Sequence, residues 1–269
     1  DLAESDRYAT PALRKQHLDE LYEHIAAFAS TIDTAEQFEQ AFAGRPPGMQ
    51  TVGDALAAYQ LSLNAADSPF DRWYFGGDEA AVTQAVKRGF ELFVNEGRCV
   101  SCHLVEETQA LFTDNRFHNV GVGINEIQGE VPALANEYIE AGITGDEVDI
   151  AVLSDKRSSE LGRFAVTTDF DGLGSFKTPT LRNVAVTSPY MHNGVLGSLE
   201  QVVHFYNTRD TKPRECRDVS DPGFGKDCWP GPEVARNVNT EELGDLKLTA
   251  DQEALLVEFM ATLTDGYPE

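Results

Sequence analysis

The stretch GRCVSCH, residues 97–103, holds two cysteines separated by two residues and followed at once by a histidine. Thiols at this spacing, Cys99 and Cys102, can form thioethers to the two vinyl groups of one porphyrin, which places His103 under the iron as an axial ligand. A thioredoxin-type redox pair is a competing interpretation, but no βαβ pattern surrounds the motif. A zinc site would need two further ligands, and the other two cysteines, twelve positions apart, do not resemble a second knuckle. The motif therefore predicts one covalently attached haem c.

Helical patterns flank this motif. A helix over about 79–94 runs into it and carries Gly89 and Phe93, where a cytochrome c domain packs its first helix across its last. Residues 249–263 supply that last helix, with Thr249 as its cap and an apolar stripe at Leu255, Leu256, Phe259, Met260 and Leu263.

Upstream of the motif, the sequence predicts three further helices. The first covers 10–30, with Thr10 as its N-cap and Pro11 at its first helical position. A short helix follows Thr34, with Phe38 and Phe42 on one face, and a third covers 51–63. The segment 68–78 has the character of an ordered connector, and 121–175 that of long loops with short helices. No strand pattern is strong anywhere, so we expect a mainly α fold.

The composition restricts the class of protein. The chain has 269 residues and a formal net charge of −24, from 45 acidic and 21 basic side chains. Such a surface repels nucleic acid and anionic membranes and would steer toward a basic partner, unless it serves solubility alone. No apolar run reaches membrane-spanning length. The sequence begins at Asp1, so we expect either a removed leader or a longer product.

The second cysteine pair, Cys216 and Cys228, lies in a loop rich in Gly, Pro and Asp. Free buried thiols are the alternative, but the polar flanks favour a disulfide, which would stabilise the loop by roughly 2–3 kcal/mol. A disulfide implies an oxidising compartment, here the periplasm or another exported location.

The segment KTPTLRNVAVTSPYMHNGVLGSLEQVVHFYN, residues 177–207, closely resembles a signature of bacterial dihaem cytochrome c peroxidases and their MauG-type relatives. The segments 68–73 and 112–122 and the helix into the haem motif resemble the same family, in the same order. On this resemblance, residues 1–78 correspond to a helical tail of the first haem domain and 79–269 to the second, cytochrome c-type haem domain. In the peroxidases, the second haem passes electrons to the first, where peroxide reacts.

The resemblance also implies a distal iron ligand. The family position that carries a methionine in the peroxidases falls on Tyr206 here, and MauG-type members also have tyrosine there. A phenolate oxygen is a harder ligand than a thioether and favours ferric and higher oxidation states. Met191 is the competing ligand, because sulfur is the usual distal donor in small cytochromes.

Further residues carry over from the family. Arg182 is expected to face a haem propionate, where a guanidinium fits a carboxylate, unless it is a surface arginine. Thr187 and Pro189 match positions whose backbone carbonyls bind calcium between the two haem domains. His118 and His192 match family motifs, and structural roles are favoured over iron ligation for both.

The chain departs from the family in one respect: it has one CxxCH motif instead of two. The peroxide-reacting haem, and with it the catalytic residues, would therefore lie on a separate chain or in an upstream part of a longer product. Alternatively, the protein has lost that haem domain and works with one haem. We expect the second-haem portion of a MauG-like or peroxidase-like enzyme that uses peroxide-derived oxidising equivalents, working with a second haem-bearing chain or domain and with a redox partner or protein substrate. The alternative is a monohaem electron-transfer cytochrome without catalysis of its own.

Overall fold

The computed structural model describes residues 35–45, 48–63, 65–124, 130–142 and 156–266, together with 16, 19–20, 22–25 and 27. The chain divides into two compact units. One unit comprises residues 1–64 and 145–155, and the other comprises 65–144 and 156–269. The haem motif lies in the second unit.

The first unit contains two of the predicted helices, α2 (Ala35–Ala41) and α3 (Met49–Ser62). Phe38 in α2 packs against Phe42, with ring centroids 4.7 Å apart, as the spacing predicts. The described positions of the predicted helix 10–30 are helical. Its predicted cap at Thr10 and Pro11 lies outside the described residues.

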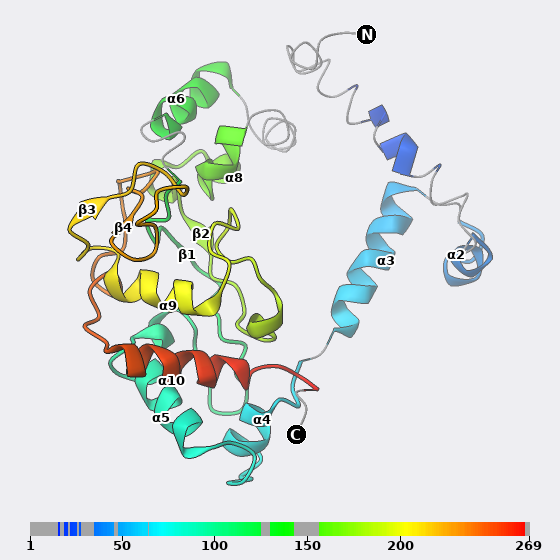
Figure 1. Ribbon diagram of the computed structural model, residues 1–269. Coiled ribbons are helices and arrows are strands. Elements are labelled where there is room, and N and C mark those ends of the chain that lie inside the picture. Colours follow the sequence, from blue (N-terminus) through cyan, green and yellow to red (C-terminus); the bar gives the residue numbers. More distant parts are fainter. Residues whose placement is uncertain are drawn as a thin grey trace. The chain divides into compact units, whose positions relative to one another are not determined.

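The second unit is built mainly from helices joined by long loops, which confirms the mainly α fold (Figure 1). Its α-helices are α4 (Pro69–Tyr74), α5 (Gln84–Val94), α6 (Val131–Ala141), α8 (Phe164–Thr167), α9 (Leu199–Thr208) and α10 (Ala250–Ala261). Short 3₁₀ turns are η2 (Cys99–Ser101), η3 (Lys156–Leu161), η4 (Phe170–Gly172) and η5 (Val184–Val186).

Helices α5 and α10 cross in close contact, and α9 lies against α10 (Figure 1). Gly89 permits the α5–α10 crossing, because a Cβ atom there would collide with the backbone carbonyl of Leu255. Thr249 caps α10 as predicted: its hydroxyl accepts from Gln252 N at 3.3 Å, and Gln252 Oε1 accepts from Thr249 N at 2.9 Å. Four of the five side chains in the predicted apolar stripe are buried in the core, namely Leu256, Phe259, Met260 and Leu263.

The segment that precedes α5 is part of the same core. Ser68 caps α4, donating its backbone N–H to Asp71 Oδ2 at 3.0 Å. Phe70 is fully buried and packs its ring against Phe112 and Phe259 at centroid distances of 5.3 and 5.8 Å. The compact unit therefore begins at Ala65, upstream of the boundary between residues 78 and 79 drawn from the sequence.

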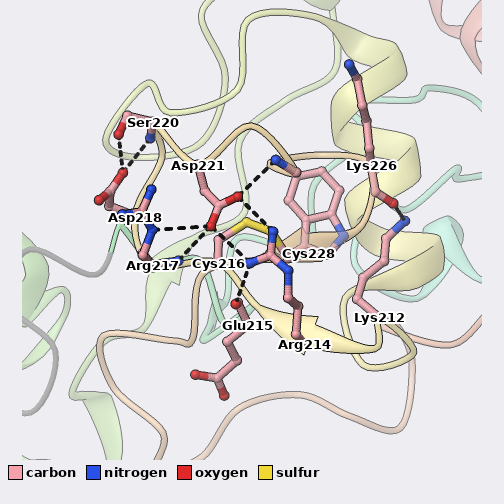
Figure 2. Close-up of a disulfide and its surroundings, with 12 residues drawn as sticks. Lys212, Arg214, Glu215, Cys216, Arg217, Asp218, Ser220, Asp221, Lys226 and Cys228 are labelled. Atoms are coloured by element: carbon pink, nitrogen blue, oxygen red, sulfur yellow. Dashed lines mark hydrogen bonds and ion pairs between the residues drawn. A yellow bond between two sulfur atoms is a disulfide. The ribbon is translucent and has the colours of Figure 1, made fainter.

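Strands in the described residues are only two residues long. β1 (Phe117–His118) pairs antiparallel with β2 (Phe176–Lys177), and β3 (Arg214–Glu215) pairs parallel with β4 (Cys228–Trp229). The predicted disulfide is confirmed: it joins Cys216, the residue after β3, to Cys228 in β4 (Figure 2). No helix among the described residues combines the length and the apolar character needed to cross a membrane.

Candidate haem site

The haem motif follows α5 through one tight turn. Arg98 adopts a left-handed backbone conformation with φ 53°, and η2 begins at the next residue. The turn closes with the backbone N–H of His103 donating to Cys99 O at 2.9 Å. This compact turn places both thiols and the imidazole on the wall of one cavity.

The cavity has a volume of about 520 Å³, within the range of cofactor sites. Most of its lining is apolar and comes from segments far apart in sequence, including Phe93, Leu181, Val203 and Met260. Cys99 and Cys102 are both free thiols. Burial raises the pKa of Cys99 to about 12, so this thiol is protonated at neutral pH. Two free thiols beside a large apolar cavity fit a macrocycle bound through thioethers.

His103 is prepared for metal ligation by its hydrogen bond. Its Nδ1 lies 2.8 Å from the carbonyl oxygen of Phe112. A carbonyl only accepts, so Nδ1 carries the proton and Nε2 keeps its lone pair. Burial lowers the pKa of His103 and outweighs the opposing effect of this hydrogen bond, which favours the neutral ring that a metal requires. The sequence analysis did not foresee the Phe112 carbonyl, because a backbone acceptor leaves no signal in residue type.

The two candidate distal ligands are neighbours in space. Tyr206 lies in α9, and Met191 lies in the loop before that helix with a positive φ of 70°. The Tyr206 hydroxyl is 3.9 Å from Met191 Sδ, and both side chains line the cavity with His103. Burial raises the pKa of Tyr206, so the phenol keeps its proton until a cation replaces it.

Arg182 has a different partner from the one expected. Its guanidinium donates to both carboxylate oxygens of Asp71, at 2.5 and 2.7 Å, and its Nε donates to Ala110 O at 2.8 Å. Arg182 does not border the cavity. In this structure a buried carboxylate of α4 occupies the guanidinium, and the contact of Arg182 with a haem propionate stays a prediction.

The remaining predicted residues lie on the cavity wall. His118 Nε2 is 2.8 Å from Asp114 Oδ2, and His192 Nε2 is 2.7 Å from Glu160 Oε2. His192 also stacks on Phe176 at 3.6 Å between centroids. These contacts support the structural roles expected of both histidines.

Thr187 and Pro189 border the same cavity, on the segment between η5 and the loop that carries Met191. Calcium binding by their backbone carbonyls stays a prediction.

A cytochrome c-type arrangement of helices, with a CxxCH turn on the wall of a macrocycle-sized cavity, defines a protein that carries haem c. Comparison with known proteins gives the family: residues 5–80 match the family of di-haem cytochrome c peroxidases that includes MauG. The chain belongs to this family of dihaem cytochrome c peroxidases and MauG proteins.

Individual relatives agree. The chain is 36% identical over 176 residues to a cytochrome-c peroxidase of Denitromonas iodatirespirans, a match that covers 63% of this chain and 44% of the relative. It is 33% identical over 219 residues to the methylamine utilization protein MauG of Paracoccus denitrificans, covering 79% of this chain and 50% of that protein.

A crystal structure of a MauG-like protein associated with microbial copper homeostasis superposes with a TM-score of 0.59 at 25% identity, over 91% of this chain and 62% of that one. With 44% and 50% of the two curated relatives covered, the chain spans about half the length of the curated relatives it matches.

Proposed function

We propose that this chain is the second-haem portion of a MauG-like or dihaem cytochrome c peroxidase-like enzyme. Cys99 and Cys102 would hold one haem c covalently, and His103 and Tyr206 would bind its iron. The observation that supports this most directly is that both thiols, the imidazole and the phenol border one cavity of about 520 Å³. When bound, the haem supplies one-electron redox chemistry driven by peroxide-derived oxidising equivalents.

The residues of the chain set the conditions for that chemistry. The Phe112 carbonyl fixes the tautomer and ring orientation of His103, which increases the basicity of Nε2. Tyr206 offers a hard oxygen donor, which stabilises oxidised iron relative to a thioether such as Met191. The apolar lining excludes water and lowers the local dielectric constant.

The surroundings support an exported enzyme that works with another protein. The disulfide between Cys216 and Cys228 favours an oxidising compartment such as the periplasm. Because the chain has one CxxCH motif in a dihaem family, the peroxide-reacting haem would lie on a second haem-bearing chain or domain. Calcium held by the carbonyls of Thr187 and Pro189 would lie next to the haem bound by Cys99 and Cys102.

Covalent haem attachment is tested by haem staining of a denaturing gel. The stain should persist in the wild-type chain and disappear in the Cys99→Ala/Cys102→Ala variant. The matched control is Cys216→Ala/Cys228→Ala, which removes two cysteines away from the cavity and should keep its stain. Stain retained by the Cys99→Ala/Cys102→Ala chain would contradict the assignment.

The enzymatic role is tested by peroxide titration of the natively purified assembly after its haems are counted. We expect two haems per assembly, a change in the haem absorption spectrum on peroxide addition, and turnover with an electron donor. A single haem that does not respond to peroxide would instead support the alternative, an electron-transfer cytochrome.

A further inference from the structure

The last turn of α9 is tied to α10 by a buried amide. Asn207 is only 5% exposed. Its Oδ1 accepts from Leu248 N at 3.0 Å, and its Nδ2 donates to Leu248 O at 2.9 Å, so the side chain pairs with both backbone groups of one residue. Nδ2 also donates to Glu253 Oε1, in the first turn of α10, at 2.5 Å.

Glu253 binds α9 at a second point, one helical turn earlier. His204 Nδ1 donates to the Glu253 carboxylate at 3.0 and 3.1 Å. Lys212 Nζ donates to His204 Nε2 at 2.8 Å. It also donates to Lys226 O at 2.5 Å (Figure 2). The imidazole is thus used at both nitrogens, and the carboxylate accepts from two residues of α9 that lie on one face.

The backbone of the same turn is also fixed. Gly244 N donates to Tyr206 O at 2.6 Å, and Leu246 N donates to Asn207 O at 3.2 Å. These bonds satisfy two carbonyls at the end of α9 that have no partner within the helix. Leu246 lines the haem cavity, so the segment that holds α9 is itself part of the cavity wall.

Tyr206 lies between the two tied residues, His204 and Asn207, and is the only residue of the three that lines the cavity. A helix that rotates by one residue turns through about 100°, which would remove Tyr206 from the cavity. Met191 Sδ lies 3.9 Å from the Tyr206 hydroxyl and also borders the cavity, so it is a competing donor atom. The choice of donor therefore depends on the rotation of α9.

We propose that Asn207 is a positioning residue, which, together with Glu253, fixes the rotation of α9 so that Tyr206 and not Met191 faces the iron. This inference rests on the proposed ligation by Tyr206. Asn207 does not line the cavity, and it acts through the helix that carries the ligand.

The test uses the haem-loaded chain and reads the sixth ligand by electron paramagnetic resonance and by the far-red charge-transfer absorption of methionine-ligated ferric haem. Asn207→Asp keeps the acceptor for Leu248 N but loses both donated hydrogen bonds and puts a second carboxylate against Glu253. We expect the ratio of tyrosine-ligated to other forms to fall about tenfold, the effect of leaving buried polar groups unpaired. The lost population should appear as methionine-ligated or five-coordinate haem.

Rescue separates positioning from loss of folding. In Asn207→Asp/Glu253→Gln, the new amide can donate to the new carboxylate, which restores the α9–α10 hydrogen bond with reversed polarity. The tyrosine-ligated signal should return in part, because Leu248 O still lacks its donor. The matched control is Glu258→Gln, also on α10, whose carboxylate accepts from Thr83 Oγ1 at 3.2 Å and not from α9. This control should keep the wild-type spectrum.

The two proposals fail in different ways. If Tyr206→Phe leaves the spectrum of the wild type unchanged, Tyr206 is not the ligand, and both the ligation by Tyr206 and the positioning role of Asn207 are overturned. If Tyr206→Phe changes the spectrum but a folded Asn207→Asp chain keeps full tyrosine ligation, only the positioning role of Asn207 is overturned. A spectrum altered by Asn207→Asp and not even partly restored in the double variant also overturns it.

Discussion

Breaking the buried ion pair between Arg182 and Asp71 should strongly destabilise the folded chain. Both side chains are buried, with 8% and 10% of their surface exposed, and both carboxylate oxygens accept from the guanidinium. Arg182→Met keeps much of the side-chain volume but leaves the carboxylate with only Ser68 as a partner. Removing one partner of a buried pair costs about 3–5 kcal/mol. For a chain of this size, the unfolding temperature should fall by roughly 6–20 °C.

The measurement is urea unfolding of the haem-loaded chain at neutral pH, followed by far-ultraviolet circular dichroism. Arg236→Met is the matched control, because Arg236 pairs with Asp171 at 3.2 Å on the surface and should contribute less than about 1 kcal/mol. The double variant Asp71→Asn/Arg182→Met should recover much of the loss, since no uncompensated charge stays buried.

The result that would refute this reasoning is specific. If Arg182→Met unfolds at the wild-type urea concentration but shifts the reduction potential of the haem, then Arg182 acts on the haem propionates and not on Asp71. The reasoning is also refuted if Asp71→Asn leaves the stability unchanged while Arg182→Met is strongly destabilising, because Arg182 would then stabilise the fold through a group other than Asp71.

Further predictions concern acid, packing and the disulfide. Burial alone would raise the pKa of Asp71, but hydrogen bonds from Arg182 and Ser68 outweigh it and hold this pKa below its usual range. The stability that this carboxylate contributes should therefore be complete above about pH 4 and be lost as the pH falls through the lowered pKa, so acid titration should narrow the difference between wild type and Arg182→Met. Gly89→Ala should cost at least about 1–3 kcal/mol in urea unfolding, because the helix crossing has no room for a methyl group, whereas Gly53→Ala, with open space around it, should be neutral or stabilising. Reducing the disulfide should cost about 3 kcal/mol in the wild type, and the same reductant should leave Cys216→Ala/Cys228→Ala unchanged.

Local patterns predicted much of this structure. The cap at Thr249 and the pairing of Cys216 with Cys228 depend on residues close in sequence, where spacing restricts geometry. The apolar stripe of α10 was predicted because helical periodicity records which face is buried.

Side-chain partners distant in sequence were not predictable. Arg182 pairs with a carboxylate 111 positions upstream, and nothing in the segment around either residue records that meeting. The family resemblance favours Tyr206 over Met191 as the ligand, but the sequence does not show that the tertiary fold brings both side chains together at the cavity. The Asn207 contacts to Leu248 depend on how α9 lies against α10, which periodicity does not specify.

The distribution of the cavity lining along the chain has a consequence for how the protein is made. Phe93, close to the haem motif, and Met260, in the last helix, both line the cavity. A contact between residues so distant in sequence can form only once the chain between them has been made and its long loop has closed. While the chain is being synthesised, Cys99 and Cys102 are therefore accessible long before the helix that encloses them exists. Chemistry at these thiols is easiest on the open chain, and the closing of α10 over α5 then encloses its product.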